Sequence, residues 1–203
     1  MRTAALVLGL LASTAADPQP ERWDEAFAEA ERRAPVAREC LVRARAVLEG
    51  WWALRDPVTG LLPRRTDDPR WAPQDNAADL FPFLVLAAGF TAPDYQDGLS
   101  EVFRREVELT TRLDGLPDWY SIPERRFLHA QPDIARLVFG ATEYAKDGLN
   151  PLIELLGPEP WSGRMLQLVD GVLTHASVAS DFGPLPAGDT EVNGELLQVL
   201  TRL

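Results

Sequence analysis

Apolar residues recur along this chain at helical spacing, in segments of two kinds. In the segment after Pro35, four of them follow one another at steps of three and four: Leu41, Ala44, Leu48 and Trp51. This spacing is typical of an amphipathic helix that buries one face. The first kind of segment is therefore a helix with one side in water.

The second kind is apolar on every side, as in residues 80–90, and is typical of a helix inside a protein. Pro82 constrains where this helix begins, because a proline in the first turn removes no intrahelical hydrogen bond. Asp79 as N-cap places Pro82 in that first turn, and this start is favoured. Asn76 as N-cap is the alternative, and it predicts a kink at the proline.

The alternation continues to the end of the chain. The sequence predicts a short leading helix over 24–33, amphipathic helices over 99–113 and 165–173, and more apolar helices over 133–146 and 191–203. Gly148 is expected to end the helix over 133–146. Few runs have the alternating pattern of a strand, so the predicted fold class is all-α.

A loop built from glycine, leucine and proline occurs three times, always between an amphipathic helix and a more apolar one. The copies read Gly60-Leu61-Leu62-Pro63, Gly115-Leu116-Pro117 and Gly183-Pro184-Leu185-Pro186. Recurrence on this scale indicates a repeated helix–loop–helix unit. Amphipathic helices would then form an outer layer, and apolar helices an inner layer.

This helix order and the three loops resemble the six-hairpin glycosidase-like superfamily, whose members are (α/α)6 toroids. The resemblance covers residues 34–203 and implies repeated helical hairpins with the long loops on one rim. Only three of six hairpins fit, and the chain stops inside an apolar helix. The sequence therefore predicts a truncated chain with roughly half of a toroid; a complete three-hairpin bundle is the alternative. No single family's catalytic motif matches, so no catalytic residue follows from the resemblance.

Acidic residues gather at three places on the expected rim, where helix N-termini favour negative charge. The first place holds Asp75 and Asp79 as catalytic candidates, with Trp71 and Asn76 as substrate-binding candidates. Carboxylates four residues apart share one face if the helix already starts at Asp75. Glycoside cleavage typically uses two carboxyl groups, and helix capping is the alternative role.

The second place follows the middle loop. Asp118 is a catalytic candidate, and Trp119, Tyr120 and His129 are substrate-binding candidates, because aromatic faces stack on sugars and carboxylates bind hydroxyls. An aromatic that pins the loop to the core is the alternative.

The third place is the start of the last helix. Glu191 is a catalytic candidate there, and Asn193 is a substrate-binding candidate, with Asp189 and Glu195 beside them. A first-turn role at the helix N-terminus is the alternative.

Composition excludes several classes. Acids outnumber bases 31 to 20, which disfavours a nucleic-acid partner. No histidine and cysteine cluster has metal-ligand spacing and no cofactor motif occurs, so no metal or cofactor is expected. Cys40 is the single cysteine and is expected to be a buried small hydrophobe.

The N-terminus has the pattern of an export signal. Residues 1–16 combine Arg2, an apolar run and small residues, and the run is too short to span a bilayer. Residues 17–33 are read as linker and leading helix, and residues 34–203 as the domain. A secreted or periplasmic protein without a membrane span after signal cleavage is expected.

Together these features predict an exported carbohydrate-active protein, of glycoside-hydrolase type, that acts on a carbohydrate substrate by carboxylate acid/base catalysis. A non-catalytic module that binds glycan or protein is one alternative. A polysaccharide lyase that uses Tyr120 and His129 is the other.

Overall fold

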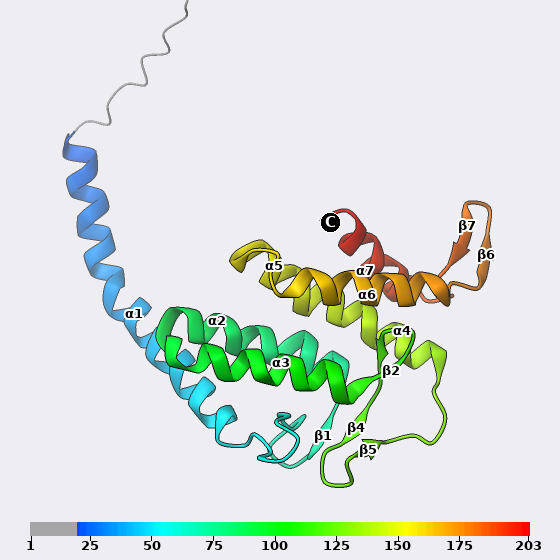
Figure 1. The fold of residues 1–203 in the computed structure, drawn as a ribbon. Coiled ribbons are helices and arrows are strands. Elements are labelled where there is room, and N and C mark those ends of the chain that lie inside the picture. The colour runs from blue at the N-terminus through cyan, green and yellow to red at the C-terminus, as the bar shows by residue number, and fades with distance from the viewer. Residues whose placement is uncertain (1–19) are drawn as a thin grey trace, which may run out of the picture. The chain divides into compact units, whose positions relative to one another are not determined.

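The computed structural model describes residues 20–203, with side chains from Trp23 onward. The expected signal peptide, residues 1–16, lies outside the described residues. The chain divides into two compact units between Cys40 and Leu41. The described chain is mostly α-helical with a few short strands, which confirms the expected fold class at this coarse level (Figure 1).

The elements follow one another in chain order, with η marking π-helical or 3₁₀ turns. They are α1 (Pro20–Trp52), β1 (Arg70–Trp71), η1 (Pro73–Leu80), α2 (Phe81–Thr91), η2 (Pro93–Tyr95), α3 (Gln96–Thr110), β2 (Thr111–Leu113), β3 (Leu116–Pro117), β4 (Tyr120–Ser121), β5 (Arg126–Phe127), α4 (Ile134–Glu143), η3 (Tyr144–Leu149), α5 (Asn150–Leu156), α6 (Trp161–Thr174), β6 (Val178–Ser180), β7 (Gly183–Leu185) and α7 (Thr190–Leu200).

The expected break between a leading helix and a second helix is wrong. α1 continues through Pro35 as one helix. The proline removes one hydrogen bond to the Glu31 carbonyl, but this stretch is exposed, so water can replace the missing donor. Cys40 is exposed rather than buried, because its surroundings on α1 are exposed as well. No described helix has the length and apolar character needed to cross a membrane.

The helices of the second unit pack in two sets. The more apolar helices contact one another in sequence order: η1 lies against η3 and α4, and α7 lies against α4 and η3. The amphipathic helices cover them, since α3 packs on α2 and α6 packs on α4 (Figure 1). Within α1, Leu48 is buried in this core, while Ala44 and Trp51 are partly buried.

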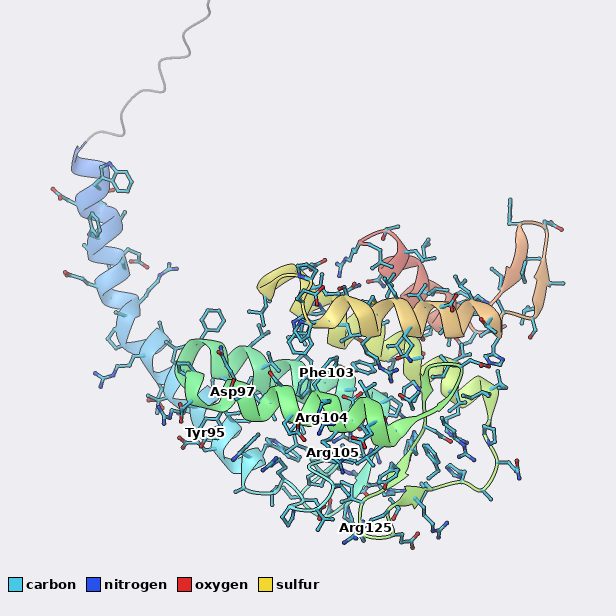
Figure 2. All side chains as sticks on the ribbon, viewed as in Figure 1. Tyr95, Asp97, Phe103, Arg104, Arg105 and Arg125 are labelled. Atoms are coloured by element: carbon cyan, nitrogen blue, oxygen red, sulfur yellow. The ribbon has the colours of Figure 1, made fainter. Side chains whose placement is uncertain are left out.

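An aromatic cluster joins the helices on one side of the core. Phe103, which Figure 2 labels on α3, stacks with Phe81 at a centroid distance of 6.0 Å and meets Trp161 edge-on at 4.9 Å. Two residues further along α3, Arg105 reaches the first glycine loop and donates from Nε to the Thr59 carbonyl oxygen at 3.1 Å. α3 thus contacts the aromatic core through Phe103 and the first glycine loop through Arg105.

The glycines of the three repeated loops all have a positive φ. Gly60, Gly115 and Gly183 all have positive φ, at 77°, 85° and 115°. Residues with a Cβ rarely adopt this region, so each loop needs glycine at its turn. The loop repeat read from the sequence therefore has a common structural cause.

The loops contain short strands that the sequence did not predict. The helix predicted to reach residue 113 ends at Thr110, and β2 and β3 form a hairpin around Asp114 and Gly115. β6 and β7 form a second hairpin, and β1, β4 and β5 form a three-stranded antiparallel sheet. A strand of two or three residues is too short to leave a hydrophobic period in the sequence.

The helix formed by η1 and α2 begins earlier than Asp79. Its first residue is Pro73 and its N-cap is Ala72, so the favoured Asp79 cap is wrong. The first turns are π-helical, and the Phe81 N–H donates to the Asn76 carbonyl. Pro82 follows without ending the helix. Asp75 and Asp79 consequently lie on the helix itself.

η3 is the second π-helical segment, and it packs directly against η1. The expectation that Gly148 ends the preceding helix is wrong, because this glycine lies within η3. A Cβ at Gly148 would stand 2.4 Å from the Ala77 carbonyl oxygen and 2.8 Å from the Tyr144 ring. The absence of a side chain therefore sets how closely the two π-helical segments approach.

A polar cluster lies in the core beside η3. Glu106 accepts a hydrogen bond from the Tyr144 hydroxyl at 3.2 Å, and Arg164 lies over the Tyr144 ring at 5.7 Å. All three side chains are buried, and Glu106 Oε1 has no hydrogen-bond partner among the described residues. Burial raises the pKa of Glu106 to about 7, although Arg164 and Tyr144 act in the opposite direction.

Replacing Gly148 by alanine tests the close approach of η1 and η3. We expect Gly148→Ala to lower the free energy of unfolding by about 1–3 kcal/mol, because a backbone carbonyl must move. The control is Gly163→Ala in α6, where an added Cβ meets nothing within 4 Å and should be neutral or stabilising. Chemical denaturation measures both, and equal stabilities would contradict the packing.

The pH dependence of stability tests the burial of Glu106. An unperturbed glutamate has a pKa of 4.5, whereas the pKa of Glu106 in the folded protein is about 7, so stability falls as pH rises from about 4.5 to about 7. We expect wild type to lose on the order of 3 kcal/mol relative to Glu106→Gln between pH 5 and 8. Denaturation of both proteins across this range measures the difference, and a parallel pH dependence would contradict it.

Candidate functional site

Asp75 and Asp79 line one groove on the exposed face of the inner helix. The groove has a volume of about 420 Å³, and Arg64, Trp51 and Phe83 also line it. Because η1 starts at Pro73, the two carboxylates lie four residues apart on the same face. Two carboxyl groups and two aromatic rings thus share an open depression.

The two carboxylates of the groove have different surroundings. Arg64 Nε donates to Asp75 Oδ2 at 2.7 Å, which gives Asp75 a fixed positive neighbour. The pKa of Asp79 is raised, first by loss of hydration and then by the carboxylates of Asp147 and Asp75. Asp79 therefore keeps its proton to a higher pH than an isolated aspartate.

Further carboxylates lie near the groove on the neighbouring helical segments α4, η3 and α7. Glu143 ends α4, Asp147 lies in η3, and Glu191 and Glu195 lie on α7. Lys146 lies among them, with Nζ 3.0 Å from Asp147 and 3.2 Å from Glu195. We call these residues, together with Asp75 and Asp79, the acidic face.

Glu143 is the most perturbed carboxyl group of the acidic face. Its pKa is raised to about 7, first by burial and then by the negative charges of Glu195, Asp147, Asp79 and Glu191. Glu195 is buried and paired, since it accepts from Thr142 Oγ1 at 2.8 Å and from Lys146. A glutamate that exchanges its proton near neutral pH can act as a general acid or base.

Three of these groups are close enough to hold a metal ion. One carboxylate oxygen each from Glu143, Glu191 and Glu195 lies within 4.8 Å of the other two. Oxygen ligands of this kind suit a hard cation such as Ca²⁺. The sequence predicted no metal, because that prediction rested on histidine and cysteine spacing. Lys146 already supplies one positive charge next to Glu195.

Asp118, the remaining catalytic candidate, does not lie in the groove. Its side chain is fully buried. It accepts from Arg112 Nη1 at 2.7 Å, from Arg136 Nε at 3.2 Å and from the Trp119 N–H at 2.8 Å. Arg112 also donates to the carbonyl of His129, an exposed loop residue. These bonds tie the middle loop to α4.

The aromatic candidates lie in or beside the three-stranded sheet. Trp71 and Tyr120 pair across β1 and β4, and both are buried. Trp119 is partly buried, with the guanidinium groups of Arg64 and Arg70 at 5.1 and 5.4 Å from its ring. Arg64 thus links this sheet to Asp75 in the groove.

The two asparagine candidates clamp their own loops. Asn76 donates to the carbonyls of Leu62 and Pro63 and accepts from the Ala72 N–H. Asn193 donates to the Ala187 carbonyl and accepts from the Ala187 N–H. The same side chain therefore fastens the first and third glycine loops to the start of an inner helix.

Glu143, Lys146 and Asp147 belong to the acidic face but were absent from the sequence candidates. They fall at the end of a helix, while the acidic candidates came from helix starts. The π-helical turn of η3 changes which side chains share a face of the helix. No pattern of residues in the sequence predicted this turn. Gly140 in α4 and Gly148 within η3 were the available signal for close packing.

Comparison with known proteins gave no match: no family model matches the chain, and no curated protein or solved structure matches it either.

The pKa of Glu143 tests the electrostatics of the acidic face. We expect a value near 7 that falls when Glu195 is replaced by glutamine, because the charge of Glu195 raises it. Carboxyl ¹³C NMR titration measures it, with Glu154→Gln on α5 as the control. An unchanged value in Glu195→Gln would contradict the coupling.

Proposed function

We propose that this protein is a carbohydrate-active enzyme of glycoside-hydrolase type that cleaves glycosidic bonds with the carboxyl groups of the groove. The observation that supports it most is the unequal pair, Asp75 beside Arg64 and Asp79 with a raised pKa. Two neighbouring carboxyl groups in environments that favour different protonation states are typical of acid/base pairs. Export to a secreted or periplasmic location, inferred from residues 1–16, is part of the proposal.

The proposed architecture is about half of an (α/α)6 toroid. Two features support it: amphipathic helices cover more apolar ones, and a positive-φ glycine loop joins each outer helix to the next inner helix. The acidic face would then line the inside of the ring.

In the proposed chemistry, Asp79 donates its proton to the leaving oxygen of the glycosidic bond. Asp75, held by Arg64, acts as the base or nucleophile. Trp51 and Phe83 offer ring faces on which a sugar can stack. Glu143 and Glu191 of the acidic face can accept hydrogen bonds from hydroxyls of further sugar units.

A non-catalytic glycan-binding module is the second candidate. The positive side chains within the acidic face favour this candidate, because Arg64 pairs with Asp75 and Lys146 pairs with Glu195. Carboxylates so paired can bind hydroxyls without transferring a proton.

Substitutions in the groove test the proposal against a panel of glycans. We expect Asp79→Asn and Asp75→Asn each to lower kcat by roughly a hundredfold or more, because one partner of the acid/base pair is lost. Asp97→Asn, at the exposed start of α3, is the matched control.

Two outcomes decide between the candidates. Hydrolysis that survives both substitutions would refute the assignment. Glycan binding that is weakened by the substitutions, in a wild type that hydrolyses nothing, would favour the binding module.

A further inference from the structure

An apolar stripe along the first half of α1 is exposed to solvent. Trp23, Phe27, Ala30, Ala34 and Ala37 follow one another at alternating steps of four and three, which is the spacing of a coiled-coil seam. Trp23 is 52% exposed and Phe27 is 65% exposed, with their rings 6.3 Å apart. Leaving two aromatic rings in water is unfavourable, so the stripe has the character of an interface.

The charges along the same helix change sign at one point. Residues 23–31 contain four acidic residues and no basic one, whereas residues 32–45 contain five arginines and one glutamate. A parallel pair of such helices would place like charges together. An antiparallel pair would place the acidic half of each copy against the basic half of the other.

We propose that the first half of α1 pairs antiparallel with α1 of a second copy of this chain, about a two-fold axis near Arg32. The dipole of a single helix also favours acids first and bases last, but only within its first and last turns. It does not account for the apolar stripe.

The apolar residues fit one register of this pair. Phe27 lies opposite Ala37 of the second copy, and Ala30 lies opposite Ala34. Trp23 lies opposite Leu41, which continues the spacing and is 47% exposed. Each aromatic ring thereby faces a smaller side chain, and the alanines at the centre let the two backbones approach.

The two neighbouring registers are less favourable, one because of charge repulsion and the other because it needs a buried residue. On the two flanks of the seam in the favoured register, Asp24 of each copy meets Arg38 of the other, and Glu31 and Arg33 each meet their own copy once, beside the axis. A shift of one heptad toward the N-terminus puts Asp24 of each copy opposite Glu31, so repulsion replaces both attractive pairs. A shift the other way needs Leu48, which is buried in the core of the second unit.

The first test exchanges charges on the full chain. Asp24→Arg and Arg38→Asp are each expected to weaken the dimer about three- to tenfold, and the double swap is expected to restore it. The two positions stand about 21 Å apart on one helix, so their coupling can arise only between copies. Sedimentation equilibrium over a wide range of concentration measures the association.

A second variant separates loss of the interface from loss of folding. Phe27→Asp is expected to abolish the dimer, whereas Ala28→Asp, next to it but off the stripe, is expected to keep it. A chain that stays monomeric at every concentration, or a dimer unaffected by Phe27→Asp, would overturn the proposal.

Cysteine cross-linking tests the direction of the pair. Exposed Cys40 lies opposite Ala26 of the second copy in the antiparallel register, and far from the other Cys40. Under mild oxidation, Ala26→Cys is expected to give a cross-linked dimer, and the added change Cys40→Ser is expected to remove it. A cross-link through Cys40 alone in the wild-type chain would mean a parallel pair and would overturn the proposal.

Discussion

The contact between Gly148 and the Ala77 carbonyl sets the geometry on which the acidic face depends. A side chain at residue 148 would overlap the backbone of η1, so the two π-helical segments reach this distance only with glycine. Their closeness lets the charge of Asp147 on η3 act on Asp79 on η1, and the direct packing of α7 on α4 adds the charge of Glu195 beside Glu143. Without the contact, Asp79 and Asp147 would lie further apart and their charges would interact more weakly.

Gathering carboxylates in this way costs stability. Asp79 and Glu143 both have raised pKa values because burial, and then neighbouring negative charges, oppose their ionisation. Arg64 and Lys146 offset only part of the negative charge. A protein that needed only a soluble surface would spread these groups apart, so their gathering on the inner helices is typical of a site with a chemical role.

The sequence was sufficient for features with a local cause. Apolar periodicity predicted the helix order, and the repeated glycines predicted turns that have positive φ in the structure. Features caused by tertiary contact were not predictable: the helix start at Pro73, the π-helical turns, and the position of Glu143 beside α7. Asp118 looked the same in sequence as Asp75, yet Arg112 on β2 and Arg136 on α4 hold it in the interior, and their pairing with Asp118 depends on how the middle loop folds.

A crystal structure of the chain with a bound oligosaccharide would show directly whether the groove holds the scissile bond. We expect a sugar ring over Trp51 or Phe83, with a glycosidic oxygen within hydrogen-bonding distance of Asp79. Sugar bound at another hollow, such as the one lined by Arg65, Asp68 and Arg70, with the groove empty, would contradict it.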